Sequence, residues 1–153
     1  MAATAWSIYN DTKLLIGQGA INFGTDGFKC ALFTTGSTCG SSSMAGAQTY
    51  SVGVRPTNEH AATGGYTSGG LVVAPTWTQA VATCTFGGTF APTAAWTATV
   101  AGMICRYAVI YDTTSGTVPL ICWSDLESVA PYVVITDTNT LTISLAAGIF
   151  SMT

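Results

Sequence analysis

The sequence predicts an all-β protein of one domain, an antiparallel β-sandwich or a jelly-roll-like barrel over residues 1–153. Three observations favour this class. Short runs rich in Val, Ile, Thr and aromatic residues recur along the chain, and such residues suit half-buried strands. Turn-forming clusters separate the runs at intervals of about 8–12 residues, which is typical of a sandwich or barrel. No linker or internal repeat divides the chain.

The first elements are a short helix and a strand. The helix is expected over about Ile8 to Ile16 and is the only helical candidate. In the run 28–35, alternation places Phe28, Cys30 and Leu32 on one face of a strand. Further strands are expected over the runs 80–88, 95–101, 103–112, 118–124, 132–136 and 140–146. In the run 103–112, the residues expected to share a face are Met103, Cys105, Tyr107, Val109 and Tyr111.

A long loop is predicted over about residues 36–70, because this segment carries few apolar side chains. Loops of such length in compact domains are usually functional or mobile. The segment 58–63 is expected to form the end of an arm that touches a neighbouring molecule. Within the loop, the candidates for structural or interface roles are Cys39, Arg55, Glu59, His60 and Tyr66.

The composition points away from nucleic acid and membrane partners. Only 7% of the residues are charged, against an average of about 25% in globular proteins, which favours assembly with other protein surfaces. The net charge is −3 and the four basic residues are scattered singly, so no basic stripe is available for phosphates. The apolar runs are far shorter than the roughly 20 residues of a membrane span. No basic and apolar leader is visible, so synthesis and folding in a cytosol are expected.

The segment 58–70, NEHAATGGYTSGG, is the strongest candidate for chemistry. Gly64 and Gly69 have the spacing of a phosphate-binding P-loop, but Gly70 stands where the lysine is required. Glu59 and His60 are adjacent, so on an extended chain their side chains point to opposite faces and do not form a pair. A single histidine also excludes His-rich metal motifs, and no nucleophile motif is present. We therefore expect no catalytic, cofactor-binding or metal-binding residues, and interpret the segment as a joint in which Tyr66 is an anchor between flexible glycines.

Two carboxylate groupings leave alternatives open. Asp125 and Glu127 would share a face of a strand, so they could hold a cation or belong to a solvated turn. Asp112 is predicted to be a turn residue whose carboxylate binds its own backbone.

The cysteines and tryptophans are expected to be mainly structural. The five cysteines, none in a CxxC pair, are Cys30, Cys39, Cys84, Cys105 and Cys122. Four of them lie in apolar runs and are predicted to be reduced core residues, whereas Cys39 lies among Gly and Ser and is expected to be the most accessible. Trp77 and the other aromatic residues could belong to the core, to a protein interface or to a carbohydrate-binding surface.

Two motifs carry a resemblance to a known group of proteins. The first follows the pattern G-x-I-x-x-x-x-D-x-[FI]-K-x-A-L and is formed by Gly19, Ile21, Asp26, Phe28, Lys29, Ala31 and Leu32. The second follows GYT-x-GG and is formed by Gly65, Tyr66, Thr67, Gly69 and Gly70. With the later strand "AVIYDTTSG", they resemble small virion proteins of tailed bacteriophages over about residues 8–150.

The resemblance implies a structural role without enzyme activity. Such proteins are capsid decoration (cement) proteins or components of the neck, collar or tail, and they are β-sandwich-like. The first expectation is therefore a homotrimer that binds the major capsid protein on the outer surface of the virion. The alternatives are a neck, collar or tail protein, or a carbohydrate-binding or receptor-binding module.

Overall fold

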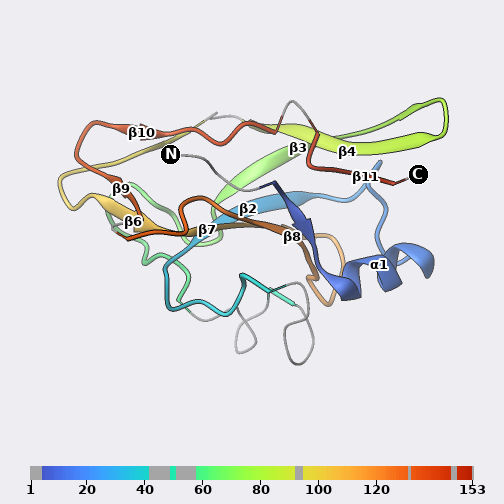
Figure 1. The fold of residues 1–153 in the computed structure, drawn as a ribbon, viewed down its shortest axis with the longest axis horizontal. Coiled ribbons are helices and arrows are strands. Elements are labelled where there is room, and N and C mark those ends of the chain that lie inside the picture. Colours follow the sequence, from blue (N-terminus) through green and yellow to red (C-terminus); the bar gives the residue numbers. More distant parts are fainter. Residues whose placement is uncertain are drawn as a thin grey trace.

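The structure is a computed structural model that describes residues 5–41, 49–50, 58–91, 95–130, 132–145 and 148–152. Its centre is one large antiparallel sheet that is nearly closed into a barrel, accompanied by one short helix (Figure 1). The predicted all-β class is therefore confirmed.

The main sheet has seven strands in the described part of the chain. In spatial order they are β1 (Ser7–Ile8), β8 (Leu120–Asp125), β7 (Tyr107–Asp112), β2 (Phe28–Phe33), β3 (Leu71–Ala80), β4 (Thr83–Ala91) and β11 (Phe150–Met152). Two smaller two-stranded sheets flank it. They are formed by β5 (Trp96–Thr97) with β10 (Thr140–Leu141), and by β6 (Met103–Cys105) with β9 (Val133–Ile135).

The middle strands β2 and β7 separate two apolar clusters. Along β2, Phe28, Cys30 and Leu32 pack into the larger cluster, whereas Ala31 and Phe33 pack into the smaller one. The predicted face of β2 is thus confirmed. Both faces of these central strands are apolar because both are covered, as in buried strands generally.

The predicted continuous strand over 103–112 is wrong, because the chain breaks at Arg106. Its amide donates to Phe33 O and its carbonyl accepts from Leu126 N, so Arg106 joins two separate sheets. As a result, Met103 and Cys105 pack into the larger cluster, while Tyr107, Val109 and Tyr111 pack into the smaller one.

The predicted strand over 80–88 is also displaced. Strand β3 ends at Ala80, the chain turns at Val81, and β4 begins at Thr83. The resulting β3–β4 hairpin reaches one end of the molecule (Figure 1). Strand β3 itself was not predicted, and it contains Pro75, a residue type that is uncommon inside strands. The predicted strands 95–101 and 140–146 contract to β5 and β10, which pair with each other.

The predicted N-terminal helix is present as α1 (Asn10–Gly17). It is held to the sheet by the buried Thr12, whose hydroxyl donates to Leu120 O at 2.7 Å and lies 3.0 Å from Ile121 O. Because the helix is only two turns long, this contact with β8 must supply stability that an isolated helix lacks.

The loop predicted over 36–70 follows the sheet in its described parts and does not project as an arm. Cys39 and Tyr50 belong to the smaller apolar cluster. The segment 58–60 continues the sheet, because Glu59 pairs with Phe33 and His60 N donates to Leu32 O. Residues 58–60 therefore lie along β2 and do not project as an arm, whereas residues 61–63 are exposed and their contact with a neighbouring molecule stays a prediction.

Candidate functional site

The most concentrated set of polar contacts surrounds the carboxylate of Glu59. Four groups donate hydrogen bonds to it: Tyr50 OH at 2.6 Å, Tyr66 OH at 2.8 Å, Gly69 N at 2.7 Å and, more weakly, Ser68 OH at 3.5 Å. We call these five residues the Glu59 joint. A partly buried carboxylate needs such donors, because leaving it without them costs several kcal/mol.

Two tyrosines connect the Glu59 joint to the sheet. Tyr66 is buried, and its hydroxyl also accepts from Leu32 N at 3.1 Å, so one oxygen joins β2 to Glu59. Tyr111 of β7 donates to Gly69 O at 2.8 Å and stacks on Tyr50 with ring centroids 3.9 Å apart. Burial, together with the nearby negative charge of Glu59, raises the pKa of Tyr66, so this hydroxyl stays protonated and acts as a donor.

The glycines of the segment 64–70 are required by close backbone contacts. A Cβ atom on Gly64 would lie 1.8 Å from Gly102 O, and one on Gly70 would lie 1.8 Å from Cys30 O. Both residues also have positive φ angles, 64° and 71°. The interpretation of these glycines as parts of a joint is thus supported by a steric reason, because the chain passes against the sheet where no side chain fits.

His60 holds the same segment to strand β6. Ile104 N donates to His60 Nε2 at 3.3 Å, so the ring proton lies on Nδ1 and is donated to Ala61 O at 2.7 Å. Its ring also meets the edge of Tyr66, with centroids 5.3 Å apart. Both ring nitrogens of His60 therefore bind backbone groups of the fold, and Glu59 and His60 share a partner in Tyr66.

The remaining predicted site residues lie apart from this joint. Trp77 on β3 is half-buried and stacks on Phe23 at 5.1 Å, so its described contact is with the core. Arg55 lies outside the described residues.

Cys39 contradicts the expectation that it is the most accessible cysteine. It is fully buried, because its loop turns inward and Tyr9 OH donates to Cys39 O at 2.7 Å. Cys84, on the β3–β4 hairpin, is the one cysteine that is only half-buried. All five thiols are free, and burial raises the pKa of Cys39 to about 12.

The carboxylates outside the Glu59 joint have separate roles. Asp125 forms an ion pair with Arg106 at 3.0 Å, and Glu127 accepts from the nearby Val129 N. Asp125 and Glu127 therefore do not form a shared cation site. Asp112 Oδ1 accepts from Thr114 N at 2.6 Å, which confirms the predicted turn.

The sequence did not reveal Tyr50 and Tyr111 as members of this region. Tyr50 has no motif around it, and Tyr111 sits in an ordinary strand pattern. Only the alternation of Tyr107, Val109 and Tyr111 on one face of β7 was available as a signal, and it does not show which loop covers that face.

A first prediction concerns Gly70. Replacing it with Ala should destabilise the fold by about 2–5 kcal/mol, because the new methyl group meets the carbonyl of Cys30 and the φ angle is left-handed. Gly19→Ala is the matched control, since Gly19 has a φ of 68° but no atom within 4 Å of its Cβ position. Urea unfolding of both variants measures the difference. Equal losses in the two would show that the close contact is not a constraint.

A second prediction concerns the Tyr66 hydroxyl. Tyr66→Phe should cost about 1–3 kcal/mol of unfolding free energy, because Leu32 N and Glu59 each lose a buried partner. Tyr132→Phe is the control, because the half-buried Tyr132 ring contacts Arg106 and that contact survives removal of its hydroxyl. Thermal unfolding compares the two, and a loss no greater for Tyr66→Phe would contradict the role of the joint.

A third prediction concerns thiol reactivity. Native protein treated with a maleimide near pH 7.5 should be modified once per chain, at Cys84, because burial keeps the other thiols inaccessible and raises their pKa values. Intact-mass spectrometry counts the adducts, and Cys84→Ser should remove the signal. Rapid modification of Cys39 in the folded protein would contradict the structure.

Comparisons with protein-family models, curated proteins and solved structures found no match to this chain. The helix α1 has eight residues, and within the described part of the chain no helix has the length and apolar character to cross a membrane.

Proposed function

We propose that this chain is a structural protein of a tailed-bacteriophage particle, most specifically a decoration protein that binds the outer surface of the capsid as a homotrimer. Its partner in this proposal is the major capsid protein. Three observations support it: the resemblance of two sequence motifs to those of small virion proteins, the low charge, and the kind of apolar side chain that is exposed.

The exposed apolar side chains favour one class of partner, protein or carbohydrate, over the other. Among the described residues, the large apolar side chains that are clearly exposed are all aliphatic: Leu14, Val72, Val81, Val100, Ile104, Val129 and Val134. Carbohydrate sites present aromatic rings to the sugar, whereas aliphatic side chains suit contacts between proteins. Val81 and Val100 are 98% and 89% exposed, so in the isolated chain they bury almost nothing. This pattern favours a protein partner over a glycan.

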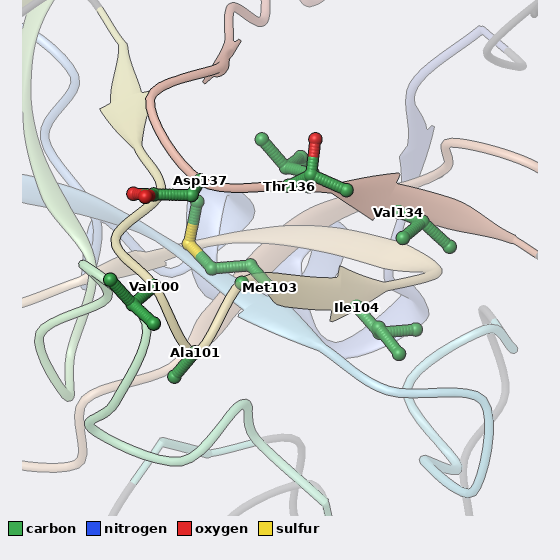
Figure 2. A pocket seen from close by; sticks show the side chains of 9 residues that line it. Val100, Ala101, Met103, Ile104, Val134, Thr136 and Asp137 are labelled. Atoms are coloured by element: carbon green, nitrogen blue, oxygen red, sulfur yellow. The ribbon is translucent and has the colours of Figure 1, made fainter.

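Three of these side chains gather at one place. Val100, Ile104 and Val134 border a shallow groove over strands β6 and β9 (Figure 2). The polar residues at its border are Thr136 and Asp137, so most of the lining is apolar. Here His60 accepts from Ile104 N of β6, and because His60 follows Glu59 in the chain and contacts Tyr66, the backbone beneath this surface is held beside the Glu59 joint.

The state of the Glu59 joint also supports a structural role. The carboxylate of Glu59 and both nitrogens of His60 are engaged in hydrogen bonds within the fold. Such groups position segments of chain, and a protein that contacts a lattice needs this rigidity. Many weak contacts, repeated over a regular shell and within a trimer, then add through multivalency.

A fourth prediction tests the proposed function through this surface. The double variant Ile104→Thr and Val134→Thr should fold normally but bind undecorated capsids at least about tenfold more weakly, because each change removes about 1 kcal/mol of apolar contact. Leu14→Thr, on the distant helix α1, is the control. Co-sedimentation with capsids measures binding, and light scattering should give three times the chain mass.

The copy number in the particle separates the proposal from its nearest alternative. A decoration protein covers the shell, so densitometry of purified particles should give copies in proportion to the major capsid protein. A neck, collar or tail component would instead be present as a single ring or a few rings. A copy number that fits only one ring or a few rings, or unchanged capsid binding by the double variant, would overturn the proposal.

A further inference from the structure

Among the residues that the structure describes, one buried carboxylate oxygen has no hydrogen-bond partner. Asp112, at the end of β7, is fully buried, and its Oδ1 accepts from Thr114 N and Ser115 N. Its other oxygen, Oδ2, is buried and has no hydrogen-bond partner among the described residues. Because a buried carboxylate oxygen without a partner is costly away from water, this atom is available to bind a positive group.

A second carboxylate lies beside it. Phe28 pairs with Asp112 across β2 and β7, which brings Asp26, two residues earlier, over the turn that follows Asp112. Gly27 secures this approach, because its carbonyl accepts from Thr113 N at 2.8 Å and its amide donates to Thr114 OH at 2.6 Å. Burial, and after it the negative charge of Asp26, raises the pKa of Asp112.

No described basic side chain neutralises this pair. The ion pair of Arg106 is made with Asp125, at the opposite end of β7 and β8. Asp26 Oδ2 accepts from Asn22 N at 2.6 Å, which fixes its carboxylate without removing its charge. Two ionised carboxylates held together in this way repel each other, and the repulsion is relieved either by a positive group between them or by a proton on one of them.

We propose that Asp26 and Asp112 bind a hard divalent cation, calcium or magnesium, which holds the turn 24–27 against the turn 113–116. Carboxylate, hydroxyl and carbonyl oxygens are the ligands that these ions prefer, whereas zinc and copper sites use thiol or imidazole groups. Two carboxylates are fewer ligands than either ion takes, so water and neighbouring backbone or hydroxyl oxygens complete the shell. The proposal does not depend on the proposed function.

The site connects parts of the fold that are distant in sequence. The turn 24–27 precedes β2, and the turn 113–116 joins β7 to β8, so the ion would clamp three adjacent strands, β8, β7 and β2, at one end. A cation bound only to the folded state stabilises it by mass action.

The test is thermal unfolding of the intact protein after treatment with EDTA, followed by titration with CaCl2 or MgCl2. The unfolding temperature should rise with the logarithm of the ion concentration, by about 5–10 °C at roughly a hundred times the dissociation constant. Isothermal titration calorimetry should show one ion per chain. The ion that gives the tighter isotherm identifies which of the two the site prefers.

Asp26→Asn gives the sharpest comparison. Without cation this variant should be more stable than the wild type, because it removes a repulsive charge and supplies an amide donor for Asp112 Oδ2. With cation it should be less stable than the wild type, since the response is lost, and the two titration curves should cross. Asp137→Asn, at an exposed position away from the pair, is the control and should keep the full response.

The absence of both binding heat and a temperature shift would overturn the proposal, as would an unchanged response in Asp26→Asn. A stability that falls with rising pH, is insensitive to both ions, and loses that pH dependence in Asp26→Asn would also overturn it. That result would show that the two carboxylates share a proton instead.

Discussion

The hydrogen bonding of the Glu59 carboxylate is the constraint on which the placement of the long connecting segment depends. Its donors come from Tyr50, Tyr66 and Gly69, and none of these three residues belongs to a helix or strand. A partly buried carboxylate tolerates few arrangements, because each lost donor leaves it less well compensated. The joint therefore selects one path for the chain over the edge of β2, and Gly64 and Gly70 make that path sterically possible.

From this joint the effect extends to the surface. His60, next to Glu59 in the chain and in contact with Tyr66, accepts a hydrogen bond from Ile104 N. Strand β6, which supports the exposed aliphatic groove, is therefore linked to the Glu59 joint. Polar groups in the interior thus fix the position of apolar groups at the surface. Asp112 shows the opposite case, because its turn supplies donors to only one of its two oxygens. In one fold, a fully satisfied carboxylate organises a joint and a half-satisfied one indicates a site for an ion.

Alternation within single strands was readable from the sequence, and breaks between strands were not. The faces of β2 and the turn at Asp112 followed from spacing and local hydrogen bonding. At Arg106, by contrast, nothing in the local pattern marks the exchange of partners between two sheets. The prediction that Cys39 is accessible was wrong for a related reason. Its polar neighbours in the sequence suggested an exposed loop, whereas Tyr9 binds its carbonyl and its side chain packs in the smaller apolar cluster.

The sequence by itself determined the all-β class, the short first helix and the role of the glycines in residues 64–70 as parts of a joint. These properties depend on residue spacing and on backbone freedom, which are local. The tertiary structure alone decided what the joint binds, which cysteine is accessible, and that Asp26 meets Asp112. Those outcomes depend on contacts between residues far apart in the chain, and only the closure of the sheet brings them together.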